Sequence, residues 1–196
     1  MQPLARMLAC ALLAVLAGAV IFAFLQPETT DRIPTAGTLL DPPRPINDFA
    51  LIDHDEQPFA NEGFTGRWSL VFFGFTQCEG VCPMTMAKLS ETVAQVERPL
   101  TVIFVSVDTR RDTPEIIARY VRSFGDDFIG LTGEPREIDK LAGSLLAPYS
   151  ISGEGVNVTV DHSSTVFLVD PDGKFAGLFS APLDVQALAN DLRKII

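Results

Sequence analysis

Two cysteines separated by three residues are the most reactive pair of side chains in the sequence. Cys78 and Cys82 stand in a short polar turn between the apolar run Val71–Phe75 and Pro83, where a segment of helical character begins. Proline suits the first helical position, and the positive end of a helix lowers the pKa of a nearby thiol. If the helix begins within the turn, positions i and i+4 share a face and the two sulfurs can converge. The spacing predicts a redox-active dithiol or a site for a soft metal.

The scarcity of other soft ligands narrows the kind of site. Cys10 lies inside an apolar N-terminal run, so the available ligands of this class are Cys78, Cys82, His54 and His162. A structural zinc site wants four Cys or His ligands and would have to recruit all of these residues. Two thiolates and one imidazole suit copper, because sulfur holds Cu(I) and a nitrogen completes a site for Cu(II). A dithiol–disulfide couple in an oxidising compartment uses the same cysteines and stays open.

The two histidines differ in their surroundings. His54 lies among acidic and polar residues, and we expect it to be a solvated turn residue. His162 follows a predicted hairpin and precedes a buried strand. At this position it could be either a metal ligand or a histidine that forms ordinary hydrogen bonds at the end of a strand. Two roles are likewise possible for Asp108 and Asp161: each could orient a metal ligand, or each could be a loop carboxylate that ends a strand.

Strands and helices alternate in the part of the chain that must position these residues. The predicted strands are 49–52, 68–75, 101–107, 128–131, 165–169 and 174–179, and the predicted helices are 83–96, 113–124, 135–146 and 185–195. Residues 147–160 depart from this rhythm and predict a projecting β-hairpin. The order predicts an α/β fold of thioredoxin type, a mixed sheet flanked by helices with an inserted hairpin.

The N-terminal residues predict one transmembrane helix before this domain. Met7–Leu25 is an uncharged apolar run of 19 residues, long enough to span a bilayer. A cleaved signal peptide is the alternative, but its apolar region would be shorter. Arg6 precedes the run and acidic residues follow it, so we expect the remainder of the chain to lie outside the cytoplasm.

We therefore expect a membrane anchor at 1–25, an extended linker rich in proline at 26–45, and a folded domain at 46–196. The formal net charge of −10 gives no indication of a nucleic-acid partner.

Three motifs, taken in order, resemble those of the Sco (SenC) family of copper proteins over roughly residues 46–196. They are Phe73-Gly74-Phe75-Thr76-x-Cys78-x-x-x-Cys82-Pro83, Ser106-Val107-Asp108-Thr109-x-x-Asp112-Thr113-Pro114-Glu115, and Val160-Asp161-His162-Ser163. Members of that family are membrane-tethered thioredoxin-fold proteins that help to assemble the copper centre of cytochrome c oxidase. The resemblance implies that Cys78, Cys82 and His162 are the metal ligands.

The resemblance implies a copper-binding assembly factor for Cu(I) and Cu(II), a metallochaperone rather than an enzyme. The N-terminus lacks the character of an organelle transit peptide, so we expect a single-pass protein of a bacterial inner membrane that faces the periplasm. Its expected partners are the copper-bearing subunit of cytochrome c oxidase and a periplasmic copper donor. The alternative is a membrane-anchored thiol–disulfide oxidoreductase that reduces the target's cysteines through a Cys78–Cys82 disulfide. Copper or redox sensing through a partner is a third possibility.

The sequence departs from the family pattern inside the cysteine turn. Glu79-Gly80 stands where Pro-Asp is common, and Phe75 stands where Tyr is common. A carboxylate beside a thiolate tends to raise the pKa of the thiol, and glycine loosens a loop. We therefore expect copper affinity and reduction potential to differ from the family norm. The segment Asp112–Glu115 is interpreted as the start of a helix.

Overall fold

A mixed β-sheet organises the part of the chain that the computed structural model describes. This part comprises the backbone of residues 35–152, 159–162 and 164–196, and the side chains of 35–150 and 164–196. The strand order is β1-β10-β9-β4-β5-β6-β2-β3. The strands are β1 (Thr38–Pro45), β2 (Leu51–Asp53), β3 (Pro58–Phe59), β4 (Trp68–Gly74), β5 (Leu100–Ser106), β6 (Ile129–Thr132), β9 (Val166–Val169) and β10 (Lys174–Phe179). Strands β4, β5 and β6 are parallel, and the other pairings are antiparallel.

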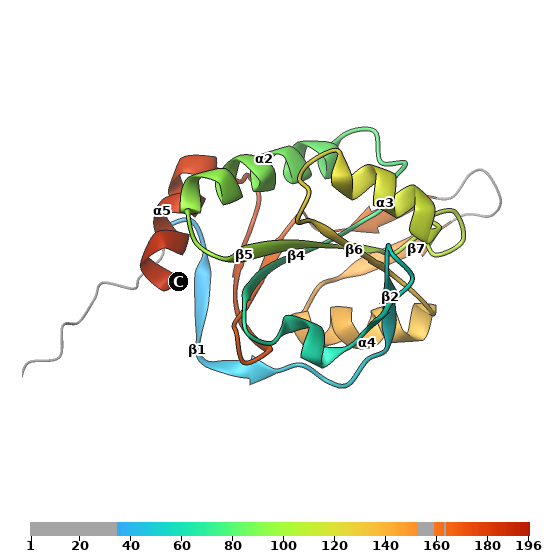
Figure 1. The fold of residues 1–196 in the computed structure, drawn as a ribbon, viewed down its shortest axis with the longest axis horizontal. Helices are drawn as coiled ribbons and strands as arrows, with labels where there is room; N and C mark the ends of the chain where they lie inside the picture. The colour runs from blue at the N-terminus through green and yellow to red at the C-terminus, as the bar shows by residue number, and fades with distance from the viewer. Residues whose placement is uncertain (1–34, 153–158, 163) are drawn as a thin grey trace, which may run out of the picture. The chain divides into compact units, whose positions relative to one another are not determined.

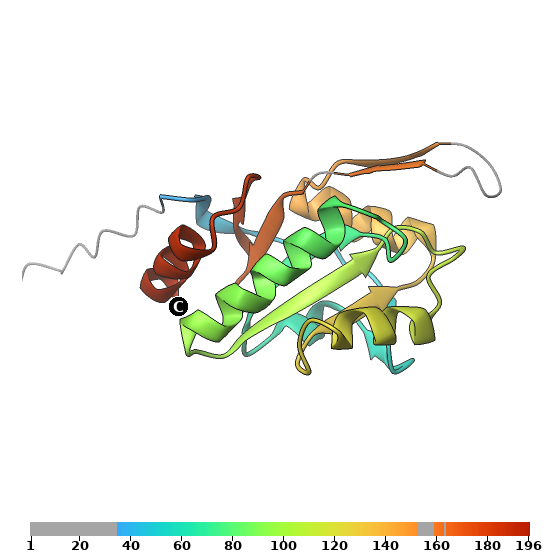
Figure 2. The same cartoon turned by 90° about the horizontal axis from the view of Figure 1, so that it is seen from above.

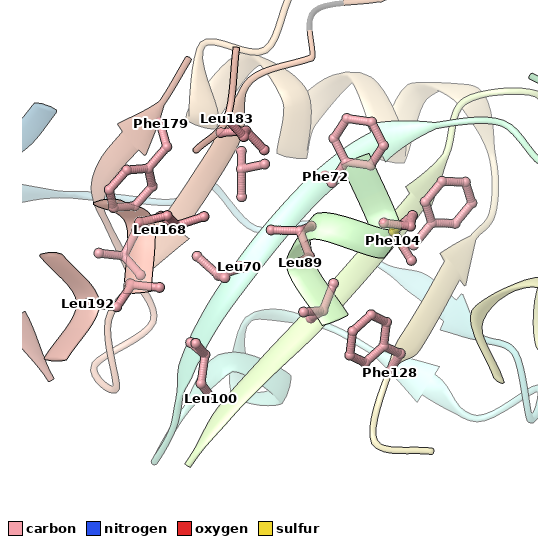
Figure 3. Close-up of a cluster of buried hydrophobic side chains, with 14 of the residues drawn as sticks. Leu70, Phe72, Leu89, Leu100, Phe104, Phe128, Leu168, Phe179, Leu183 and Leu192 are labelled. Atoms are coloured by element: carbon pink, nitrogen blue, oxygen red, sulfur yellow. The ribbon is translucent and has the colours of Figure 1, made fainter. Parts of the chain in front are cut away.

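Helices cover both faces of this sheet (Figure 1). They are the 3-10 helix η1 (Asn61–Phe64) and the α-helices α2 (Val81–Val96), α3 (Pro114–Arg122), α4 (Pro135–Leu145) and α5 (Val185–Ile195). One core lies between the sheet and helices α2, α3 and α5, and Figure 3 shows Leu70, Phe72 and Phe104 within it. A second core packs α4 and η1 against the opposite face. This arrangement confirms the predicted mixed sheet flanked by helices.

The two central strands are buried over almost their whole length. The side chains of β4 between Ser69 and Gly74 are all buried, and β5 pairs with β4 in register from Trp68 opposite Leu100 to Gly74 opposite Ser106. An unbroken apolar strand suits a parallel sheet covered on both faces. Because both strands run in the same direction, the loops that carry the cysteines and Asp108 leave the sheet at the same edge.

The predicted hairpin is present as a separate two-stranded ribbon. Strand β7 (Tyr149–Ser152) pairs antiparallel with β8 (Thr159–His162), and Tyr149 stands opposite His162. The ribbon extends away from the main sheet (Figure 2). Its base is tied to helix α4, because the Tyr149 hydroxyl donates a hydrogen bond to the carboxylate of Asp139.

Several local features differ from the sequence predictions. Helix α2 begins at Val81, so Pro83 is its third residue and not its first. Residues Thr38–Pro45, part of the predicted linker, form β1 and pair with β10. Proline tolerates this place because β1 is an edge strand, which leaves backbone N–H positions outside the ladder.

His54 is not the solvated turn residue that the sequence predicted. Its side chain is only 10% exposed, and its Nδ1 accepts a hydrogen bond of 3.1 Å from the backbone N–H of Gly130. The contact comes from β6, 76 residues further along the chain. A contact so remote in sequence left no pattern around His54 from which burial could be predicted.

No helix within the described residues is long and apolar enough to cross a membrane. The predicted anchor at 1–25 lies outside those residues.

Candidate metal centre

The two cysteines occupy the junction between strand β4 and helix α2. Cys78 lies in the turn before the helix and is half-buried, whereas Cys82 lies in the first turn of the helix and is fully buried. Both are present as thiols. The backbone N–H of Cys82 donates to the sulfur of Cys78 at 3.4 Å. The spacing alone suggested that Cys78 and Cys82 share one face of a helix. Because the helix begins at Val81, Cys78 lies before it and presents its sulfur to the N-terminus of the helix.

Their surroundings drive the pKa values of the two thiols in opposite directions. Partial burial raises the pKa of Cys78, but hydrogen bonds from the Cys82 thiol and from the N–H groups of Gly80, Cys82 and Val81 outweigh it and lower the pKa overall. For Cys82, burial raises the pKa, and its hydrogen bond to Cys78 raises it further. Backbone donors and the positive helix end stabilise a thiolate at Cys78. The pair therefore combines a half-buried thiol at Cys78, whose ionisation is favoured, with a buried thiol at Cys82 that donates to it.

The expectation for Glu79 is corrected by this geometry. The sequence predicted that its carboxylate would raise the pKa of the adjacent thiol, but the pKa of Cys78 is lowered and Glu79 is not among the causes. Glu79 is exposed, so solvent screens its charge. The backbone donors lie in direct contact with the sulfur and determine the direction of the shift.

The absence of a side chain at Gly74 leaves room for the sulfur of Cys82. A β-carbon at Gly74 would lie 2.9 Å from the Cys82 sulfur and 2.9 Å from the ring of Phe104. Real side chains essentially never approach so closely, so either neighbour would have to move. The glycine in the Phe-Gly-Phe-Thr sequence thus lets the helix bring Cys82 onto the sheet.

Asp112 secures the cysteine turn to the neighbouring loop. Its side chain is 1% exposed, and its carboxylate accepts hydrogen bonds from the Thr76 N–H at 2.8 Å and the Thr76 hydroxyl at 2.6 Å. The Ser106 hydroxyl donates to the same carboxylate at 2.5 Å. A buried carboxylate held by three donors is a well-satisfied anion, and it links the end of β5 to the residue two positions before Cys78.

This role of Asp112 was not predicted from the sequence, where Asp112–Glu115 was interpreted only as the start of a helix. That helix is capped by Thr113, whose side chain accepts a hydrogen bond from the N–H of Ile116 at 3.4 Å. A usable signal was present: an acidic residue directly before a threonine that already caps the helix has no capping task of its own.

Asp108, which the sequence left open, does orient neighbouring groups. It is 4% exposed and accepts a hydrogen bond from the Nε of Arg111. The guanidinium of Arg111 in turn lies over the ring of Phe75, with 5.9 Å from its central carbon to the ring centroid. The backbone carbonyl of Phe75 accepts a hydrogen bond from the N–H of Cys78 at 3.3 Å. Asp108 therefore holds the Arg111 guanidinium over the ring of Phe75, which lies in the segment that leads to Cys78. The side chain of Asp161 lies outside the described part.

The third predicted ligand, His162, ends strand β8, and its side chain lies outside the described part of the chain. Its position in the fold can still be followed through its neighbours. Ser164, two residues later, lines a cavity of about 170 Å³ together with Val81, which stands between the two cysteines. Met84, Lys88 and Leu183 also line this cavity. The fold therefore brings the chain just after β8 to the cysteine turn, across some 80 residues of sequence.

The donor set in this region fits a soft metal better than a hard one. Within 35–150 and 164–196, no three side chains of His, Cys, Asp or Glu gather as a metal site. The two thiols stand together, and the nearby carboxylates of Asp108 and Asp112 are engaged by Arg111, Thr76 and Ser106. Thiolate ligands select Cu(I), and completing a site would require one donor from beyond the described side chains.

Comparison with known proteins agrees with this chemistry. The chain is 34% identical over 154 residues to the mitochondrial SCO2 homologue of Bos taurus, covering 75% of this chain and 58% of that protein. It is 36% identical over 138 residues to the human mitochondrial SCO1 homologue, covering 67% of this chain and 46% of that protein. The alignments thus span about half the length of these mitochondrial relatives.

Solved structures show the same fold. The copper-bound ScoI of Arabidopsis thaliana superposes with a TM-score of 0.72 at 31% identity, covering 76% of this chain and 96% of that one. The apo Sco1 of Thermus thermophilus superposes with a TM-score of 0.74 at 33% identity, covering 82% and 96%. Copper is the metal bound in homologues of this chain. The sequence model of the SCO1/SenC family matches residues 38–196, and the chain belongs to that family.

Proposed function

We propose that this protein binds one copper ion through the thiolates of Cys78 and Cys82 and the imidazole of His162. The observation that supports this proposal is the cavity lined by both Val81 and Ser164, because Ser164 follows His162 by two residues and Val81 stands between the two cysteines. The lowered pKa of Cys78 supports it, because the thiolate is the form that binds metal. Binding would also require deprotonation of the buried Cys82, so copper must displace its proton.

The copper would be cargo for the assembly of a respiratory enzyme. We propose that the protein delivers copper to, or matures, the copper-bearing subunit of cytochrome c oxidase, after receiving it from a periplasmic donor. This role rests on membership of the SCO1/SenC family and its motifs. The proposed setting is a bacterial inner membrane, with residues 1–25 as the anchor and the folded domain facing the periplasm.

A thiol–disulfide oxidoreductase is the second candidate, and the inequality of the two thiols favours it. A half-buried thiolate at Cys78 suits attack on a partner's disulfide, and the buried Cys82 suits resolution of the mixed disulfide. In that reaction the partner's disulfide gains two electrons and two protons, while Cys78 and Cys82 become a disulfide. This activity would not need His162.

Copper titration of the reduced protein and of three variants separates these functions. Cys78→Ser and Cys82→Ser should each abolish tight Cu(I) binding, because thiolates dominate the affinity. His162→Ala should retain most Cu(I) affinity but weaken Cu(II) binding and change the thiolate-to-Cu(II) absorption. An unchanged Cu(II) spectrum in His162→Ala would remove that residue from the ligand set. The second candidate, a thiol–disulfide oxidoreductase, would be favoured if the wild-type chain bound no copper and still reduced a protein disulfide.

A further inference from the structure

The first residue of the β7–β8 ribbon is held to the body of the domain by both ends of its side chain. The Tyr149 hydroxyl donates a hydrogen bond to Oδ1 of Asp139 on helix α4. The ring of Tyr149 packs against the core between the sheet and α4, which contains Leu141 and Leu145 of that helix. The ring gives the residue its place, and the hydroxyl adds a directional contact with the helix.

The connection between helix α4 and the ribbon is short. Only Leu146, Ala147 and Pro148 separate the end of the helix from Tyr149. Ala147 is buried, and its N–H donates to the carbonyl of Ala142 at 2.8 Å. Proline fixes its own φ angle, so this connection leaves the ribbon little freedom. The hydrogen bond of Tyr149 limits that freedom further.

The register of the ribbon carries this constraint to His162. Tyr149 stands directly opposite His162 in the antiparallel pairing of β7 with β8. The Cα atoms of such opposite residues lie about 4.5–5.5 Å apart. Holding Tyr149 in place therefore also holds the backbone of His162.

The cysteine turn is supported by the same core. Phe75, whose backbone carbonyl accepts the N–H of Cys78, packs against the buried cluster that also supports Tyr149. Protein interiors are close-packed and deform little, so groups seated on one core keep their relative positions. The strand that ends in His162 and the turn that carries Cys78 are thus both referred to this core.

We propose that Tyr149 is a positioning residue, whose hydrogen bond to Asp139 holds the base of the ribbon so that His162 is placed to bind copper beside the cysteine turn. The inference rests on the proposed function, because it takes His162 to be a copper ligand. A ligand on a projecting ribbon loses freedom when it binds the metal. A contact that restricts the ribbon beforehand reduces this cost and raises the affinity.

The test uses the full-length chain with Tyr149→Phe and with Asp139→Ala, each of which removes the hydrogen bond. Each variant should weaken Cu(II) binding by about three- to tenfold, the size expected for one hydrogen bond. Cu(I) affinity should stay near that of the wild type, because the thiolates dominate it. The double variant should bind Cu(II) no more weakly than either single variant, since both delete the same interaction. Asp139→Asn keeps an acceptor oxygen and should stay close to the wild type.

Glu137→Ala is the matched control on the same helix. The carboxylate of Glu137 accepts hydrogen bonds from Lys140 Nζ at 2.7 Å and from the N–H of Ala50 at 2.9 Å, and neither partner belongs to the ribbon. This variant also loses a contact of α4, but it should keep the wild-type affinity for both Cu(I) and Cu(II).

Amide hydrogen exchange of the copper-free chain keeps this inference separate from the proposed function. Tyr149→Phe and Asp139→Ala should each speed the exchange of β7 and β8 amides by about three- to tenfold, and Glu137→Ala should not. A His162→Ala chain with wild-type Cu(II) binding would overturn the proposed function. Wild-type exchange of the ribbon in Tyr149→Phe would instead show that the hydrogen bond does not hold it, and would overturn the inference.

Two results of the copper titrations would also overturn the inference. One is wild-type Cu(II) affinity in both Tyr149→Phe and Asp139→Ala. The other is an equal loss of Cu(I) and Cu(II) affinity in these variants, because general damage to the domain would affect both oxidation states, whereas displacement of His162 should affect mainly Cu(II).

Discussion

Removing the carboxylate of Asp112 should destabilise the domain and release the cysteine turn. Asp112→Ala leaves three donors unsatisfied: the Thr76 N–H, the Thr76 hydroxyl and the Ser106 hydroxyl. Each hydrogen bond to a charged acceptor contributes about 1.5–3 kcal/mol to stability. Thr76 is only half-buried and can recruit water, so we expect a total loss of about 3–5 kcal/mol in the free energy of unfolding. That is a large part of the roughly 5–15 kcal/mol of a typical domain.

Asp112→Asn separates the charge from the geometry. The amide can still accept through one oxygen, and the Thr76 hydroxyl can turn to accept from its NH₂ group, so the cost should fall to about 1–2 kcal/mol. The Asp112 charge contributes to the raised pKa of Cys82, so its removal should lower that pKa. Asp112→Ala should in addition weaken Cu(I) binding by about tenfold or more, because the loop that carries Cys78 loses its support.

Asp191 provides the matched control for both measurements. It is also 1% exposed and accepts three hydrogen bonds, from the N–H and hydroxyl of Thr35 and the N–H of Ala36. It lies on α5, whose Arg193 contacts Gln95 near the far end of α2 from the cysteines. Urea unfolding should show comparable losses for Asp191→Ala and Asp112→Ala, with Cu(I) affinity lowered only in the latter. Equal copper affinity in the two variants would refute the reasoning.

Four further outcomes are expected. Gly74→Ala should displace the Cys82 sulfur and lower Cu(I) affinity about tenfold or more, as measured by chelator competition, and wild-type affinity would contradict the close contact found here. The alkylation rate of Cys78 should rise with a midpoint below the ordinary thiol pKa, while Cys82 stays unreactive in the folded chain; a midpoint at or above the ordinary value would contradict the lowered pKa. Because the folded-state pKa of Cys78 is lowered, its ionisation should add stability that is complete above the ordinary thiol pKa and lost as the pH falls through the lowered value, and Cys78→Ser should flatten urea-unfolding profiles in that window. Oxidation of Cys78 and Cys82 to the disulfide should abolish tight copper binding without reductant, and stoichiometric binding to the oxidised chain would place the metal elsewhere.

The local patterns of the sequence determined the architecture. The helix at 185–195 and the strand at 174–179 were predicted to the residue, because a period of 3.6 or 2 and turn residues at each end depend only on neighbours in the chain. The hairpin was predicted from its glycine-flanked turn for the same reason. The motifs around Cys78, Cys82 and His162 were sufficient to identify the family.

Only the tertiary structure decided how the cysteine site is held. The opposite pKa shifts of Cys78 and Cys82 arise from burial against Gly74 and from backbone donors at the helix end, which the CxxxC spacing does not contain. Asp112 reaches Thr76 across 36 residues. Such a contact leaves no local period in the sequence, because the strand order β4-β5-β6 brings the two residues together only after the chain has folded.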